Sequence, residues 1–175
     1  MQNYLSLRVF TNKACFEVME ILLLSVGKSS ANWVKEAFEL YASRVSHYIK
    51  FSSLALPDVK SGSNINRDKI KEDEGVLILS KLASHDHVVL LDENGIERTS
   101  IDFAEWLSKV FCSSKKRLVF IIGGPFGFSQ KVYDRADAKI SLSKMTFTHE
   151  MARVIFVEQL YRAMTIIRGE SYHHV

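Results

Sequence analysis

The chain reads Leu118-Val119-Phe120-Ile121-Ile122-Gly123-Gly124-Pro125-Phe126-Gly127 in the part that is most informative about its fold. The first five of these residues are all apolar, which is typical of a strand buried on both faces of a parallel sheet. The glycines that follow let the chain turn sharply and let a ligand approach the backbone. Ligands of open parallel sheets bind beyond the carboxyl ends of strands. We therefore expect either a ligand site lined by backbone or a tight turn without a ligand.

Two common nucleotide sites are excluded by the sequence. The chain has no Gly-x-x-x-x-Gly-Lys-Ser/Thr motif, and no Gly-x-Gly-x-x-Gly follows its first apolar run. A ligand at the glycines would therefore be held by backbone amides and carbonyls, without a triphosphate.

Apolar runs alternate with helical patterns elsewhere, which predicts βαβ units and a parallel sheet. Strands are expected at 21–26, 49–56, 88–92, 118–122 and 138–142. The intervening helices include one capped by Ser30, with Trp33, Leu40 and Val45 among its apolar positions, and one that begins with a Thr99–Asp102 capping box. A turn is expected at Glu93-Asn94-Gly95, directly after the third strand.

The last helix, from Thr148 to about Arg168, has apolar residues on more than one face. A helix of this kind must be covered on two sides, by deep burial in its own domain or by a second subunit. The positions concerned are Met151, Val154, Ile155, Leu160, Tyr161, Met164 and Ile167.

Composition places the 175-residue chain among single-domain globular proteins, with 47% hydrophobic and 25% charged residues. A net charge of +3 leans only slightly toward an anionic partner. Two distant cysteines indicate neither a disulfide framework nor a metal site. Arg8, Lys13 and Glu17 interrupt the apolar residues near the start, so we expect no signal or membrane segment and a cytoplasmic location.

The histidines give weaker indications. His85 and His87 flank Asp86 in what we expect to be a solvated turn, and His149 lies in the first turn of the last helix. His173 and His174 follow Tyr172 at the end of the chain, where a frayed tail and a functional tail are equally plausible. No Ser-His-Asp order or paired-carboxylate spacing supports a hydrolase.

Several motifs then occur in a fixed order from Met19 to the end of the chain. They are residues 24–28, 71–75, 90–95, 120–127, 140–149, 151–154, 158–163 and 168–174. Together they resemble one family, the RlmH-type rRNA pseudouridine N3-methyltransferases of the SPOUT superfamily. Residues 1–18 precede the resemblance and are expected to be an N-terminal extension to a domain at 19–175, with Met19 as an alternative start.

Two residues depart from the family pattern. Phe126 stands where a polar or acidic residue is frequent, and His174 replaces the usual basic residue of the tail. The charge of His174 therefore depends on pH, which bears on its contact with RNA.

The resemblance implies a SPOUT-type α/β knot: a mostly parallel sheet of five or six strands, helices on both faces and a C-terminal trefoil knot, a rare exception to un-knotted topology. It also implies S-adenosyl-L-methionine as cofactor, bound in a bent conformation in the knot. The cofactor contacts that it implies are Leu91, Gly123, Leu142, Ser143, Lys144, Met145, Thr146 and Phe147.

The implied reaction transfers a methyl group to N3 of a pseudouridine in large-subunit (23S) rRNA on the assembled ribosome, without a metal. The family works as a homodimer, in which the tail of one subunit approaches the cofactor pocket of the other. Tyr172 and His173 would then act in catalysis, and Arg153, Arg162 and His174 would contact RNA.

Some assignments stay open. His173 and Glu158 are both candidates to accept the imide proton, and water is a third. Arg162 is also spaced to form an ion pair with Glu158 on the helix surface. Two alternative functions are a non-catalytic ribosome-binding or assembly factor of this fold and a SPOUT methyltransferase acting on tRNA.

Overall fold

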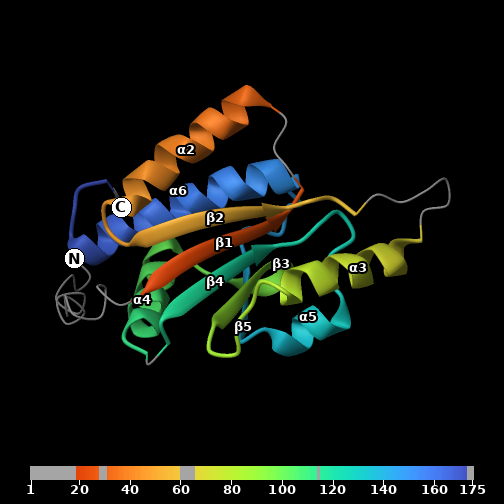
Figure 1. Ribbon diagram of the computed structural model, residues 1–175. Helices are drawn as coiled ribbons and strands as arrows, with labels where there is room; N and C mark the ends of the chain where they lie inside the picture. Colours follow the sequence, from red (N-terminus) through yellow and green to blue (C-terminus); the bar gives the residue numbers. More distant parts are fainter. Residues whose placement is uncertain (1–18, 28–30, 60–65, 114, 173–175) are drawn as a thin grey trace.

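The computed structural model describes residues 19–27, 31–59, 66–113 and 115–172. The predicted extension at 1–18, the predicted cap Ser30 and the tail residues His173 and His174 lie outside the described residues. Within these described residues, five strands and five helices alternate (Figure 1). They are β1 (Glu20–Val26), α2 (Asn32–Ser46), β2 (Lys50–Leu56), α3 (Arg67–Leu79), β3 (His87–Glu97), α4 (Ser100–Phe111), β4 (Arg117–Ile122), α5 (Gln130–Arg135), β5 (Ala138–Ser141) and α6 (His149–Arg168).

The strands form one sheet in the order β2-β1-β4-β3-β5, and all neighbouring pairs are parallel. The predicted parallel sheet is thereby confirmed, with five strands. Since β1 lies between β2 and β4, its carboxyl end meets theirs at one edge of the sheet, and the chain leaves that edge in different directions. Such a switch point is where open α/β sheets bind ligands.

Helices cover both faces of the sheet, as predicted. α2, α4 and α6 lie on one face, and α3 and α5 lie on the other (Figure 1). In β4, Phe120 points into the core beneath α6, where its ring centroid is 4.6 Å from that of Phe156, whereas Ile121 points into the core beneath α3 and α5. The uninterrupted apolar run of β4 therefore reflects burial on both faces.

The expected turn at Glu93-Asn94-Gly95 is wrong, because β3 continues to Glu97. β5 pairs with β3 on both sides of these residues, and the register shifts between Leu91 and Ile96. The three residues are accommodated as an irregularity within the strand. A Cβ atom on Gly95 would lie only 2.5 Å from the carbonyl carbon of Ile140, so the glycine permits this close pairing.

Two expectations about the helices have different outcomes. The capping box at Thr99 and Asp102 is confirmed at the start of α4. In α2, however, Trp33 and Leu40 are 59% and 49% exposed, although they belong to the apolar pattern that predicts the helix. Only Val34 and Val45 of this helix are fully buried. None of the described helices is long and apolar enough to cross a bilayer.

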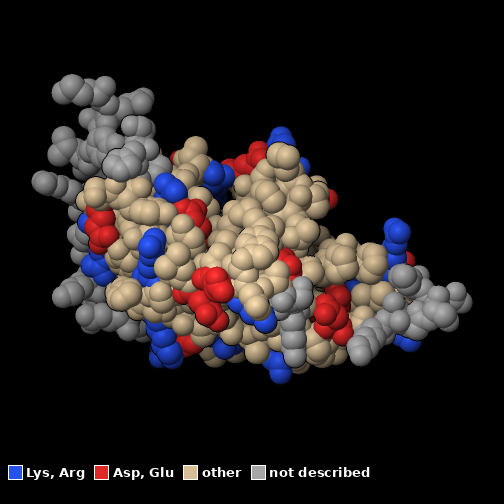
Figure 2. Space-filling model, turned by 90° about the horizontal axis from the view of Figure 1, so that it is seen from above, with Lys and Arg blue, Asp and Glu red and all other residues tan. Residues whose placement is uncertain are grey.

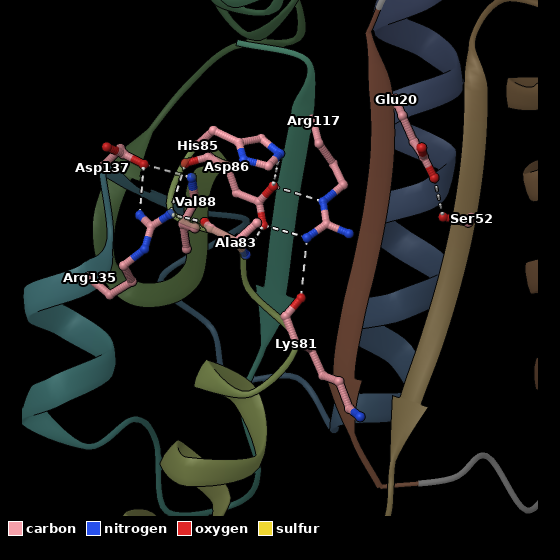
Figure 3. A network of polar contacts seen from close by, with 10 residues as sticks. All are labelled: Glu20, Ser52, Lys81, Ala83, His85, Asp86, Val88, Arg117, Arg135 and Asp137. Carbon is pink, nitrogen blue, oxygen red and sulfur yellow. Dashed lines mark hydrogen bonds and ion pairs between the residues drawn. The ribbon is translucent and has the colours of Figure 1, made fainter.

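The expected solvated turn is confirmed at His85, which is exposed in a turn, but His87 begins β3 and the side chain of Asp86 between them is fully buried. Arg117 donates two hydrogen bonds to its carboxylate, from Nε at 2.8 Å and from Nη2 at 2.5 Å, in the network of Figure 3. Burial alone would raise the pKa of Asp86, but hydrogen bonds from Arg117 and from the Ala83 N–H hold it below its usual value. Arg135 donates to the carbonyls of Ala83 and Asp86, so the network joins the amino ends of β3, β4 and β5.

Candidate functional site

The predicted ligand contacts meet at the carboxyl ends of β4, β3 and β5. Leu91 of β3 lies opposite Ile122 of β4 and opposite Ile140 of β5. Gly123 directly follows Ile122, and Leu142 directly follows the last residue of β5. Three segments that are far apart in the sequence thus end side by side at one edge of the sheet.

The glycine loop after β4 leaves no room for side chains at two of its positions. A Cβ atom on Gly123 would lie 3.0 Å from the ring of Phe128, and one on Gly124 would lie 2.5 Å from Oε2 of Glu74. Gly127 closes the turn at a φ of +80°, and its N–H donates to the carbonyl oxygen of Gly124 at 3.2 Å. The loop therefore presents bare backbone at the end of the sheet.

The loop between β5 and α6 presents exposed side chains at the same edge. Its backbone is fixed by local hydrogen bonds, from the Ser141 hydroxyl to the carbonyl of Ser143 and from the Met145 N–H to the Ser143 hydroxyl, both at 2.9 Å. Met145 is 76% exposed and Phe147 is 36% exposed. Two large apolar side chains beside a bare glycine loop can surround an apolar ring.

A polar cluster adjoins these segments at the end of β1. Arg153 of α6 is buried, and its Nη2 donates to the carbonyl oxygens of Val26, at 3.1 Å, and of Gly27. Burial lowers the pKa of Arg153. A Cβ atom on Gly27 would lie 2.7 Å from Oδ1 of Asp58 and 3.3 Å from Nε2 of His149. An RNA contact was expected of Arg153, but its small exposed area indicates instead that it ties α6 to the end of β1.

Comparison with known proteins identifies the family. Residues 19–173 match the family model described as "Predicted SPOUT methyltransferase". The chain belongs to the SPOUT methyltransferase family.

This SPOUT methyltransferase has close relatives over nearly its whole domain. Proteins named "Ribosomal RNA large subunit methyltransferase H" from Christiangramia forsetii and Parabacteroides distasonis are 49% and 51% identical to it over 156 residues. Each of these alignments covers 89% of this chain and 99% of the relative. The SpoU methyltransferase AviRb from Streptomyces viridochromogenes, solved with AdoMet, is a distant structural neighbour at a TM-score of 0.40 and 11% identity, over 83% of this chain and 57% of that chain.

The described part of the tail packs against its own chain in this SPOUT methyltransferase. The ring of Tyr172 lies 4.7 Å from that of Tyr161, and its hydroxyl is 3.2 Å from Oε1 of Glu158. Burial, followed by a hydrogen bond with Tyr41 and the charge of Glu158, raises the pKa of Tyr172. Arg162 donates to Glu158 at 2.6 Å, which is the helix-surface ion pair considered as an alternative to RNA contact.

In the sequence, α6 separates Tyr172 from the predicted cofactor contacts of the same chain. The segment 142–147 precedes this helix and Tyr172 follows it. A helix of 20 residues is about 30 Å long. Tyr172, however, contacts Glu158, nine residues after the start of α6, so the described tail turns back along the helix and lies about 14 Å along its axis from the end that follows the loop.

One residue of the site is missed by the sequence interpretation. Glu74 lies in a charged stretch, Lys71-Glu72-Asp73-Glu74, that has the appearance of a solvated helix face, yet Glu74 is 3% exposed beside Gly124. The available signal was Gly75, because glycine in a helix interior costs about 1 kcal/mol relative to alanine and so marks close packing.

Proposed function

We propose that this chain is an S-adenosyl-L-methionine-dependent methyltransferase that modifies N3 of a pseudouridine in the 23S rRNA of assembled ribosomes. The observation that carries the proposal is the similarity over 99% of the length of relatives named for methylation of large-subunit ribosomal RNA. The convergence of Leu91, Gly123 and Leu142 at one edge of the sheet supports a ligand site where the cofactor contacts were expected.

The residues at this edge fit the cofactor. The bare loop at Gly123 and Gly124 allows close backbone contact, and Met145 and Phe147 can enclose the adenine. The remaining expected contacts, Leu142, Ser143, Lys144 and Thr146, belong to the same segment. When bound, the cofactor supplies a methyl group carried on a sulfonium ion.

The contribution of the chain to the reaction is alignment and the exclusion of water. Transfer neutralises charge when an anionic nitrogen attacks a sulfonium, so a dry, ordered site favours it. Of the two side chains considered as proton acceptors, Glu158 already accepts hydrogen bonds from Arg162 and Tyr172. This occupancy favours His173 or water as the acceptor.

A homodimer is part of the proposal. Trp33 and Leu40 expose apolar area on α2, and the side of the molecule that bears α2 shows uncharged surface between scattered charges of both signs (Figure 2). Exposed apolar patches of this kind mark interfaces. A partner bound there would bring its Tyr172 and His173 to the cofactor contacts of the first subunit, while His174 and Arg162 would face RNA. Ribosomes as substrate place the enzyme in the cytoplasm.

Two measurements test the function. Isothermal titration calorimetry should detect S-adenosylmethionine binding by the wild-type chain, and absence of binding at millimolar cofactor would favour the assembly-factor alternative. Mass mapping of 23S rRNA from a deletion strain should show loss of one methylated pseudouridine. If rRNA methylation were unchanged and a tRNA methylation were lost, the tRNA alternative would be correct.

A further inference from the structure

Glu74 is a buried carboxyl group without compensation among the described residues. It is 3% exposed, and its Oε2 has no hydrogen-bond partner in the described part of the chain. Burial raises the pKa of Glu74, and the nearby charge of Asp58 raises it further. Buried polar groups are nearly always hydrogen-bonded, because an unmade bond costs free energy. The position of Glu74 therefore calls for a donor or a cation from a ligand.

The carboxylate of Glu74 lies directly against the glycine loop. Its Oε2 and Oε1 are 2.5 Å and 2.6 Å from the place that a Cβ atom on Gly124 would occupy. Gly75, the next residue of α3, lets the helix approach Ser129 at the start of α5. These two glycines therefore allow the carboxylate to lie close to the backbone of the proposed cofactor site.

The charges around Glu74 favour a positive ligand. Asp58 follows β2 and adds a second negative charge that acts on Glu74. Among the described residues, Arg153 lies beside Asp58, and its Nη2 donates to the carbonyls of Val26 and Gly27. His149 also faces the end of β1. Glu74 and Asp58 thus place two carboxyl groups near one another beside the loop.

We propose that the carboxylate of Glu74 receives the positively charged methionine end of S-adenosylmethionine, beside Gly124. The assignment rests on the proposed function, since it requires that cofactor. If Met145 and Phe147 enclose the adenine, as proposed, the methionine end is the part of the ligand left to approach Gly124 and Glu74. That end carries two cations, an ammonium and a sulfonium, and both have the chemistry that an unpaired carboxylate accepts.

The test compares cofactor affinities of variants by calorimetry. Glu74→Gln keeps the shape of the side chain and removes its charge, and should weaken S-adenosylmethionine binding by about 10- to 100-fold. Glu74→Asp keeps the charge and should recover part of this loss. Glu72→Gln is the matched control, because Glu72 is exposed on the same helix in a surface ion pair with Lys131 at 3.4 Å, and it should bind as the wild type does.

S-adenosylhomocysteine distinguishes the two cations, since it keeps the ammonium and lacks the sulfonium charge. An equal loss of affinity for both ligands in Glu74→Gln would identify the ammonium as the partner, and a loss confined to S-adenosylmethionine would identify the sulfonium. Unchanged affinity for both would overturn the assignment and leave the proposed function standing. If the wild-type chain bound neither ligand, the cofactor itself and the assignment would both be refuted.

Thermal denaturation without ligand separates this role from a structural one. The raised pKa means that burial of the ionised group destabilises the folded chain above the ordinary pKa of glutamate, and Gln lacks this cost. Glu74→Gln should therefore melt at or above the wild-type temperature at pH 7.5 while binding the cofactor weakly. If Glu74→Gln melted at a lower temperature than the wild type, yet bound the cofactor with wild-type affinity at a temperature where it is fully folded, Glu74 would have a structural role alone.

Discussion

Gly124 has no space for a methyl group as the structure stands, because Oε2 of Glu74 lies only 2.5 Å from the position of a Cβ atom. Gly124→Ala must displace either the carboxylate or the loop, and overpacking of this kind costs about 1–3 kcal/mol. We expect lower stability and at least tenfold weaker cofactor binding, measured by denaturation and calorimetry. Gly127→Asn is the control in the same loop, since nothing lies within 4 Å of its Cβ position and asparagine tolerates its φ of +80°. Equal binding by both variants would argue against close contact at Gly124.

Asp86 should make the folding stability depend on pH with the opposite sign to the effect of Glu74. Because Arg117 and the Ala83 N–H lower its pKa in the folded chain, its ionised form contributes stability at neutral pH. This contribution is lost as the pH falls from about 4, the ordinary range of aspartate, through the lowered pKa. Asp86→Asn should cost about 1–3 kcal/mol at pH 7, measured by urea denaturation, and the difference from wild type should shrink below pH 4. Asp134→Asn, at an exposed site, should cost little folding stability. A stability difference between Asp86→Asn and the wild type that did not change with pH would contradict the prediction.

Among the strands, the buried segments could be predicted from the sequence, but the extension of β3 beyond its buried part could not. β1 and β4 are uninterrupted apolar runs because both of their faces are covered, and this pattern is local. The extension of β3 through Asp92-Glu93-Asn94-Gly95 depends on β5, which pairs on both sides of these residues although it follows more than 40 positions later. The burial of Glu74 likewise depends on the glycine loop, and no local pattern reports such a contact.

The exposed apolar residues of α2 lead to a prediction about the subunit interface. Trp33→Glu and Leu40→Glu would place charge in the proposed subunit interface, and each should weaken dimerisation at least about tenfold because aromatic and aliphatic anchors dominate such interfaces. Sedimentation equilibrium measures this directly. Val76→Glu is the matched control, since Val76 is 59% exposed on α3, which covers the other face of the sheet. Dissociation by Val76→Glu, with none by the α2 variants, would place the interface on α3.

In the whole molecule, the proposed homodimer would build each site from two chains. Within one subunit, Tyr172 contacts Glu158 near the middle of α6, about 14 Å along the helix axis from the end that adjoins the loop 142–147. We propose that the tail reaches the cofactor contacts from a partner instead. The predicted trefoil knot would explain why the segments 123–127 and 142–147 stay together while the tail extends elsewhere. A symmetric dimer then contains two composite sites, each with the pocket of one chain and the tail of the other.

Mixed dimers test this arrangement. A subunit that lacks Tyr172–Val175 keeps its pocket, and a Gly124→Ala subunit keeps its tail. At cofactor concentrations far below the dissociation constant of Gly124→Ala, neither homodimer should methylate rRNA appreciably. Random pairing makes half of the dimers mixed, and one site in each mixed dimer would combine an intact pocket with an intact tail, restoring about a quarter of the wild-type sites. Methyl transfer to ribosomes that lack the modification, measured on co-expressed subunits, reports the recovery. A tail that acts within its own chain would give no recovery, because no subunit would carry both intact parts.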